Sequence, residues 1–119
     1  MKKILKFIGV LFVFIFFFSS CNETKNFDKN LLPGKWKQGS LYERYLSDGS
    51  GYTWDTADDV NEEEAQAFTW TLTNDDLIQI HIMEMGGKIP KSYTVTTLSA
   101  THLSYHDSYG VKYTFTRIK

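Results

Sequence analysis

From Phe68 onward, the sequence alternates between apolar and polar residues at every second position. The apolar positions of five successive runs are Phe68, Trp70 and Leu72; Ile78, Ile80 and Ile82; Tyr93 and Val95; Leu103 and Tyr105; and Val111, Tyr113 and Phe115. Successive side chains of a strand point to opposite faces, so this period predicts strands with one buried and one solvated face. The chain is therefore constrained to an all-β fold.

Turn-forming residues separate the five runs. They are Asn74-Asp75-Asp76, Gly86-Gly87, Ser99-Ala100 and Asp107-Ser108-Tyr109-Gly110. Such short connections favour antiparallel neighbours, because a parallel crossover needs a dozen or more residues. The C-terminal half is predicted to be an antiparallel meander of about five strands.

The N-terminal strands are less regular. We expect one strand that begins at Lys35 and continues, through a bulge near Gly39, to Leu46. A hairpin turn at 48–51 then leads into a return strand over 52–54.

The acidic segment 57–65 is the one part of this region with helical character. We expect a loop or one to two turns of helix, capped by Asp58 or Asp59. Carboxylates here could supply oxygen ligands for Ca²⁺, but their spacing does not fit an EF-hand loop. A solvated loop, able to dock a basic partner, is the favoured interpretation.

The predicted inward-facing set is large and rich in aromatic residues. It comprises Trp36, Trp54, Phe68, Trp70, Leu72, Ile78, Ile80, Ile82, Tyr93, Val95, Leu103, Tyr105, Val111, Tyr113 and Phe115. Since no helix is long enough to cover a sheet, the sheet must cover itself. We expect a meander of about seven to eight strands, curled into a small, closed or partly open barrel. A two-sheet sandwich is the alternative.

Several short motifs resemble those of a known family. They are Gly34-Lys35-Trp36, Asp48-Gly49-Ser50-Gly51, Phe68-Thr69-Trp70 and Tyr113-Thr114-Phe115. With the meander, they resemble the lipocalin-like domains of small lipoproteins in Gram-negative bacteria, over about residues 31–119. The resemblance implies a lipocalin-like barrel in which Trp36 packs under a basic residue near the C-terminus. Arg117 stands in that place, so we expect a structural cation–π contact between the two. Full lipocalins are nearly twice as long as this domain.

The N-terminus has the layout of a secretory signal. Lys2, Lys3 and Lys6 are followed by an apolar run over 7–18 and by the small residues 19–20. The run covers roughly 18 Å as a helix, short of the ~30 Å hydrocarbon core of a bilayer. We therefore expect cleavage of a signal peptide.

Cys21, the only cysteine, follows this signal directly. Residues 18–21 resemble a bacterial lipobox, which implies that Cys21 is acylated, for example with palmitate, and becomes the mature N-terminus. Two or more acyl chains suffice for stable anchoring. Asn22 favours the outer membrane, with the periplasmic or surface face left open. An ordinary signal peptide with a free cysteine and an uncleaved membrane anchor are the alternatives.

These features predict three parts: a lipoprotein signal peptide over 1–20, a lipidated tether over 21–32, and a β-domain over 33–119. With Cys21 acylated, no disulfide can form within the chain. The net charge of −1 includes lysines that leave with the signal, so the mature chain is more acidic. No basic patch remains, and we do not expect a nucleic-acid partner.

A small ligand site is one candidate for the barrel interior. An eight-stranded barrel is just wide enough to be filled by side chains or to hold one small ligand, and both outcomes are open here. If a cavity exists, aromatic residues with polar tips are its expected wall. The candidates are Trp54, Trp70, Tyr93, Tyr105 and Tyr113.

No catalytic or metal site is expected. His102 and His106 lie about 13 Å apart on a strand, too far for one metal ion. Ser104 and His106 share a face, but Asp107 points the other way and cannot orient the histidine. We therefore predict no cofactor and no enzymatic activity. Met83 and Met85 either form an apolar contact patch beside the Gly-Gly turn or, if the strand twists, face a neighbouring strand.

Taken together, these features predict a membrane-anchored, non-enzymatic lipoprotein that binds a small apolar ligand or an envelope partner. A scaffold subunit of an outer-membrane complex and an inhibitor of an envelope hydrolase are the alternatives.

Overall fold

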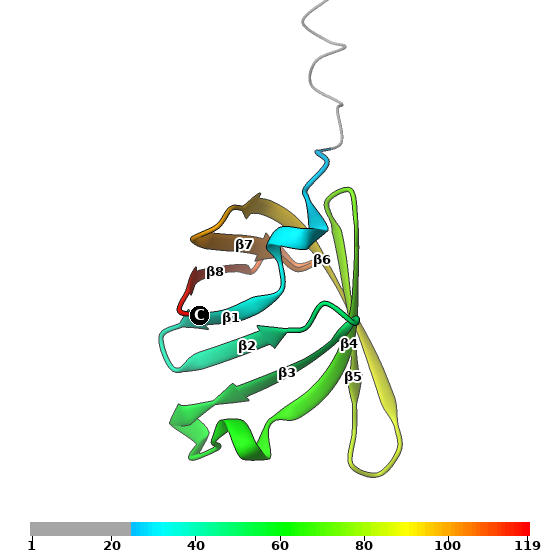
Figure 1. The fold of residues 1–119 in the computed structure, drawn as a ribbon. Coiled ribbons are helices and arrows are strands. Elements are labelled where there is room, and N and C mark those ends of the chain that lie inside the picture. The colour runs from blue at the N-terminus through cyan, green and yellow to red at the C-terminus, as the bar shows by residue number, and fades with distance from the viewer. Residues whose placement is uncertain (1–24) are drawn as a thin grey trace, which may run out of the picture.

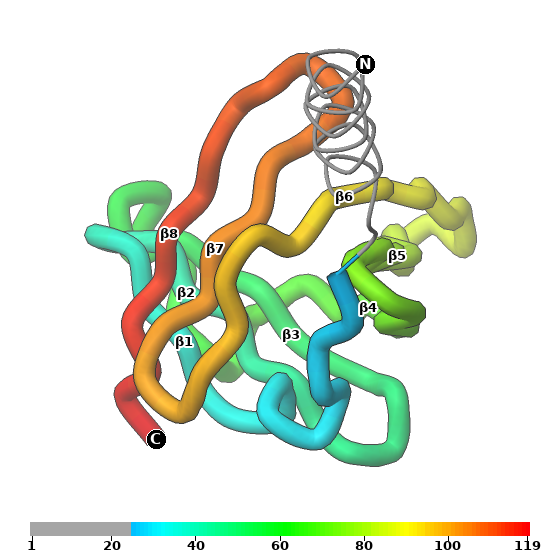
Figure 2. The backbone as a smooth tube through the Cα atoms, turned by 90° about the horizontal axis from the view of Figure 1, so that it is seen from above, coloured from blue at the N-terminus to red at the C-terminus, as the bar shows by residue number. Residues whose placement is uncertain are grey.

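The chain forms a closed barrel of eight antiparallel strands, as a computed structural model of residues 25–119 shows; the predicted signal peptide and Cys21 lie outside these residues. Each strand pairs with its neighbour in sequence, and β8 returns to β1 (Figures 1 and 2). The strands are β1 (Gly34–Gln38), β2 (Leu41–Tyr45), β3 (Ser50–Asp55), β4 (Gln66–Thr73), β5 (Asp76–Ile82), β6 (Lys88–Leu98), β7 (His102–His106) and β8 (Lys112–Arg117). The predicted all-β meander barrel is confirmed.

The barrel closes through a short pairing of β1 with β8. Trp36 lies opposite Arg117, and Lys37 lies opposite Thr116. The side-chain carbonyl of Gln38 extends this seam by accepting a 3.1 Å hydrogen bond from the backbone N–H of Thr114. Closure satisfies strand edges that an open sheet would expose.

The predicted bulge near Gly39 is instead a complete hairpin turn. Gln38 pairs with Leu41, and Gly39 has a φ of 59°, a left-handed conformation that glycine adopts without strain. One predicted strand is therefore two, β1 and β2, which brings the total to eight.

The predicted faces of β5 are reversed. A tight turn with Asn74 at a φ of 58° pairs Thr73 with Asp76, and this sets the register of the hairpin. Directly opposite residues share a face, and the inward pairs are Leu72 with Leu77, Trp70 with Gln79 and Phe68 with His81. Ile78, Ile80 and Ile82, which we predicted to be buried, therefore point outward, and Ile78 and Ile82 are each 39% exposed.

Two further predicted core residues lie elsewhere. Trp54 is buried, at 6% exposed, but it lies on the outer face of the barrel beside Tyr42, because Gly51 and Thr53 take inward positions on β3. Val111 precedes β8 and is 50% exposed, since the strand begins only after the turn that ends there.

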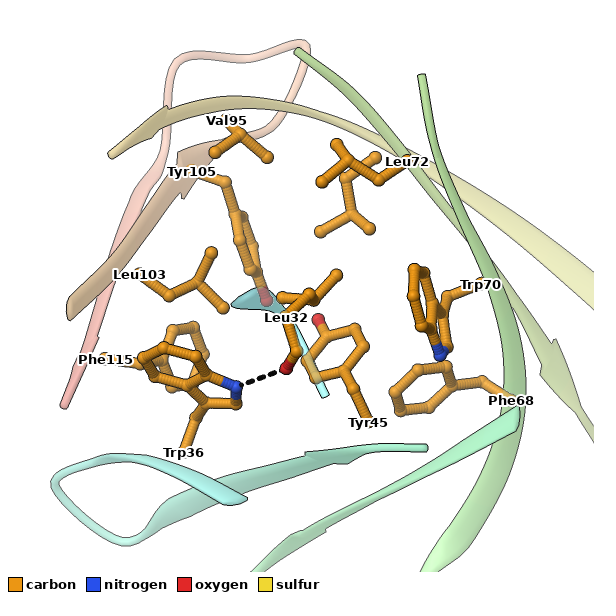
Figure 3. Packing of buried hydrophobic residues seen from close by; sticks show 11 residues of the cluster. Leu32, Trp36, Tyr45, Phe68, Trp70, Leu72, Val95, Leu103, Tyr105 and Phe115 are labelled. Atoms are coloured by element: carbon orange, nitrogen blue, oxygen red, sulfur yellow. Dashed lines mark hydrogen bonds between the residues drawn. The ribbon is translucent and has the colours of Figure 1, made fainter. Parts of the chain in front are cut away.

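One end of the barrel is closed by the N-terminal segment. The 3₁₀ turn η2 (Lys29–Leu31) crosses this end, and Leu32 inserts into the core, fully buried. Trp36 Nε1 donates a 2.9 Å hydrogen bond to the carbonyl of Leu32 (Figure 3). Phe27 also packs on the core, so Phe27 and Leu32, which the sequence assigned to the tether, belong to the packed domain.

We call this the closed end; it also carries the β2–β3, β4–β5 and β6–β7 turns. The open end is opposite and carries the β1–β2 turn, the 56–65 loop, the β5–β6 tip at 83–87 and the β7–β8 turn. The β5–β6 hairpin extends away from the entering N-terminal segment (Figure 1). Among residues 25–119, no helix has the length and the apolar character that a membrane span requires.

The predicted contact between Arg117 and Trp36 is present at the closed end. Arg117 Cζ lies 4.4 Å from the centroid of the Trp36 ring. The guanidinium also donates to the carbonyls of Leu31, Pro33 and Ala100, which joins η2 to the β6–β7 turn. Gly34 is required beside it, because a Cβ there would overlap the guanidinium.

The core between the two ends is tightly packed with aromatic and aliphatic side chains (Figure 3). Its members are Leu32, Trp36, Tyr45, Phe68, Trp70, Leu72, Leu77, Val95, Leu103, Tyr105 and Phe115. Tyr45 meets both Phe68 and Trp70 edge to face, at centroid distances of 5.3 and 5.7 Å. Gly51 lies against the Phe68 ring, where a Cβ would come within 2.6 Å of it.

Candidate functional site

A carboxylate lies in the middle of this apolar core. Glu43 points inward from β2 and is 4% exposed. Its Oε1 accepts a 2.7 Å hydrogen bond from the Tyr45 hydroxyl, and its Oε2 accepts one of 2.9 Å from the Tyr105 hydroxyl. Gln79 Nε2 lies 3.3 Å from Oε2 and donates a 2.6 Å bond to the Tyr45 hydroxyl. Strands β2, β5 and β7 thus meet at one carboxyl group.

A polar relay continues from this carboxylate toward the open end. Gln79 Oε1 lies 2.8 Å from Nε2 of His81, and Nδ1 of the same ring lies 2.9 Å from Oε1 of Gln66. Gln66 Nε2 in turn lies 3.3 Å from Sδ of Met83, at the base of the β5–β6 tip. The relay links the barrel centre to the open end.

Burial changes the acidity of Glu43 and its neighbours. Desolvation raises the pKa of Glu43 and outweighs the hydrogen bonds that favour the charged form. No salt bridge reaches this carboxylate from any cation within residues 25–119. Burial, followed by the nearby Glu43 charge, raises the pKa of Tyr45 and of Tyr105 well above the usual value, so both hydroxyls remain donors.

His81 is held in the neutral state. Burial, with a smaller contribution from the positive charge of Lys91, lowers its pKa to about 4. Because the Gln79 amide nitrogen is committed to Tyr45, its oxygen faces His81, and Nε2 must carry the proton. Because a neutral ring has a single N–H, it then donates to Gln79 and not to Oε1 of Gln66, which faces Nδ1 at 2.9 Å.

Three of the five predicted wall residues come together beside Glu43. The Tyr93 and Tyr105 ring centroids are 4.4 Å apart, and Tyr113 lies 5.3 Å from Tyr105. Tyr93 and Tyr113 are partly exposed and lie over the buried Tyr105. Burial, with the charge of Glu43 as the next cause, raises the pKa of Tyr93 to about 12. These tyrosines are the best-defined candidate contact for a small ligand.

The other two predicted wall residues do not join this cluster. Trp70 lies on the inner face of β4, where its Nε1 donates to the carbonyls of Leu46 and Ser50 at 3.1 and 3.0 Å. Trp54 stacks on Tyr42 outside the barrel, with ring centroids 5.1 Å apart and an interplanar angle of 1°. The five residues therefore do not line one pocket.

Trp54 instead helps hold the acidic loop. Lys35 Nζ lies 5.3 Å from the Trp54 ring centroid and forms a 2.9 Å salt bridge with Glu62. This loop contains two 3₁₀ turns, η3 (Thr56–Asp58) and η4 (Glu62–Glu64), in agreement with the predicted one to two turns. The cap of η3 is Asp55, not Asp58 or Asp59, since its side chain accepts from the N–H of Ala57.

The remaining sequence candidates do not form a reactive site. Within the described part of the chain, no three His, Cys, Asp or Glu side chains are placed to share a metal ion. The Ser104 hydroxyl bonds to Thr114, at 3.3 Å, and His106 Nδ1 lies 3.1 Å from the backbone carbonyl of Asp107. Ser104, His106 and Asp107 are therefore not arranged as a nucleophile, a base and an orienting acid.

The Glu43 network was missed by sequence reasoning, for a specific reason. Its position follows from alternation along Leu41, Glu43 and Tyr45, but this pattern is visible only once Gly39 is assigned to a turn. Gln79 and His81 were placed outside because three isoleucines alternate with them. The register between β4 and β5 is set by the two-residue turn after Thr73, and this turn is the part of the sequence that could have predicted the inward positions of Gln79 and His81.

No protein-family model, curated protein or solved structure matches this chain.

Proposed function

We propose that this chain is a lipid-anchored, non-enzymatic binding module of the cell envelope, similar to the lipocalin-like domains of small Gram-negative lipoproteins. Acylated Cys21 would hold it in the membrane, with the outer membrane favoured by Asn22. A partner protein would be bound by the open end of the barrel.

The observation that carries this proposal is the asymmetry of the two ends. The N-terminal segment enters at the closed end and seals it with Leu32. The loops of the open end therefore lie at the end of the barrel opposite the one that residues 25–32 cover. They include the two most exposed large apolar side chains among residues 25–119, Met85 at 97% and Tyr109 at 92%.

The packed interior favours a protein partner over an apolar ligand inside the barrel. The barrel centre holds the aromatic core and the hydrogen-bonded Glu43 network, and each buried side-chain nitrogen and oxygen among the described residues has a hydrogen-bond partner. An apolar ligand there would have to displace satisfied polar groups, which is costly.

The proposal is tested by expressing the full chain and a Cys21→Ser variant in a Gram-negative host. We expect palmitate labelling and membrane fractionation of the wild-type chain only. After gentle detergent extraction, we expect the wild-type chain to migrate in a complex of defined stoichiometry. A monomer in every extract, across detergents and chemical cross-linkers, would reject the partner-binding proposal.

The tyrosine cluster supports a second candidate, the binding of a small ligand. Tyr93 and Tyr113 present partly exposed rings over the buried Tyr105, with a carboxylate beneath. Native mass spectrometry of the chain purified from envelope extracts would detect a retained molecule. Loss of that molecule on Tyr93→Ala, with retention on Tyr109→Ala, is the expected pattern for binding at the cluster.

A further inference from the structure

A groove lies at the open end, between the start of β4 and the β5–β6 tip. It has a volume of about 540 Å³ and is lined by residues 64–67, around the start of β4, and by residues 82–85, at the β5–β6 tip. None of these residues belongs to the buried network except Gln66 and Met83, which end the relay.

The middle of the groove is apolar. Ile82 is 39% exposed and Met85 is 97% exposed, although isoleucine and methionine are usually buried. The small side chains of Ala65 and Ala67 leave space beside Ile82. Methionine is flexible and polarisable, so Met83 and Met85 can adapt to an inserted apolar side chain.

The rim of the groove is acidic. Glu64 and Glu84 line it, and neither forms a salt bridge with a cation of residues 25–119. By contrast, the neighbouring Glu62 is engaged by both Lys35 and Arg44, at 2.9 and 3.8 Å. Two free carboxylates beside an apolar floor are complementary to a segment with an apolar side chain and flanking cations.

The neighbouring edge of β6 is not the better docking site. The Met83 N–H donates to the Gly87 carbonyl, and the Val95 N–H donates to the Asp75 carbonyl. The backbone N–H and C=O groups of the odd-numbered residues of β6 therefore point toward β5. Pairing with β7 begins only at Thr94, so the part of β6 before Thr94 has a free edge. The backbone groups of its even-numbered residues point toward this edge, and one of these residues is Pro90, which has no N–H to donate. A proline between lysines is typical of an edge protected against strand addition.

We propose that this groove binds an extended segment of a partner protein in which one large apolar side chain is flanked by lysine or arginine. The apolar side chain packs on Ile82, Met83 and Met85, and the cations pair with Glu64 and Glu84. This inference rests on the proposed partner-binding function and specifies the chemistry of the partner.

The test uses the full chain in phosphatidylcholine nanodiscs, with ¹³C-labelled methyl groups on methionine and isoleucine. The probe is the acetylated peptide Lys-Ser-Leu-Ser-Lys, whose lysines and leucine share one face when extended. The matched control peptide is Glu-Ser-Leu-Ser-Glu. We expect saturable shifts of the Met83, Met85 and Ile82 methyl signals with the basic peptide, and at least roughly fivefold weaker binding of the acidic peptide.

Matched variants locate the interaction. The double variant Glu64→Gln with Glu84→Gln should bind the basic peptide roughly fivefold more weakly. Glu63→Gln, which lies outside the groove, should leave this affinity unchanged. Ile82→Ser should abolish the shifts, whereas Ile78→Ser, at the same 39% exposure on the same face of β5, should preserve them.

Absence of shifts, equal binding of the two peptides, or equal loss with the control variants would overturn the groove proposal. If the complex in native extracts also survives the Glu64, Glu84 and Ile82 changes, the groove proposal fails while partner binding stands. If no complex exists at all, the proposed function itself has failed.

Discussion

The hydroxyl of Tyr105 on β7 donates a 2.9 Å hydrogen bond across the barrel to the carboxylate of Glu43 on β2. These residues are separated by more than half of the described chain, and the bond crosses the core between strands that β8 and β1 separate in the barrel. A buried carboxylate held only by neutral donors makes the stability of this barrel depend on pH.

Glu43→Gln removes the ionisable group at the centre of the core and keeps its shape. The pKa of Glu43 is raised in the folded state, so the unfolded chain ionises first as pH rises above about 4.5. The free energy of unfolding of the wild-type chain should therefore fall, relative to the variant, from that pH up to the folded pKa. Urea titrations at a series of pH values measure the difference. A difference that does not change with pH, or that changes in favour of the wild-type chain, would contradict this account.

His81 should act in the opposite direction. Its pKa is about 4 in the folded chain and 6.5 in the reference state, so as pH falls through this interval the unfolded chain binds a proton that the folded chain does not. Across this pH interval, the free energy of unfolding should fall by about 2 kcal/mol, a value that allows for solvent screening near the open end. His81→Gln should remove this loss, measured by urea titration between pH 7 and pH 4. The exposed His102→Gln is the control, and an equal effect of both substitutions would rule out a special role for His81.

Arg117→Lys should destabilise the closed end. The lysine cannot reproduce the planar group that donates to three backbone carbonyls while lying over Trp36. We expect a loss of about 2 kcal/mol in the free energy of unfolding, because the carbonyls near Leu31 and Pro33 lose their donors. Arg44→Lys, whose guanidinium is exposed and 3.8 Å from Glu62, should change stability by less than about 0.5 kcal/mol. Equal tolerance of the two substitutions would show that Arg117 does not hold this end together.

Gly51→Ala tests the packing of Phe68. The added methyl group would lie 2.6 Å from the Phe68 ring and 2.7 Å from the Arg44 carbonyl, and neither can move freely. We expect a loss of about 2 kcal/mol and a lower Tm. The control is Gly87→Ala at the β5–β6 tip, where the nearest atom is 3.9 Å away. If the Gly51→Ala and Gly87→Ala chains have the same Tm, the core around Phe68 is not tightly packed.

The sequence predicts the barrel because period-two alternation and short turns are local signals, and both are strong from Phe68 onward. The Trp36–Arg117 contact was predicted from a family resemblance. Faces were assigned incorrectly where hydrophobicity and register disagree, as on β5, where exposed isoleucines alternate with the buried Gln79 and His81. Hydrophobicity alone cannot identify a polar network that is buried because its members satisfy one another.

The site was less predictable than the fold. Tyr93, Tyr105 and Tyr113 were identified and do meet, because they occupy inward positions on three consecutive strands. Trp54 could not be placed without knowing that Gly51 takes the inward position on β3. Glu43 could not be identified without the turn at Gly39.

The central claim is that the open end of the barrel is the partner-binding end. It is tested most directly by photo-cross-linking in cells, with a benzophenone amino acid introduced into the full chain at one position at a time. Substitution at Met85 or Tyr109 on the open end should give the same cross-linked partner, whereas substitution at the exposed Ala100 on the closed end should give none. A partner captured from Ala100 and not from Met85 or Tyr109 would contradict the claim.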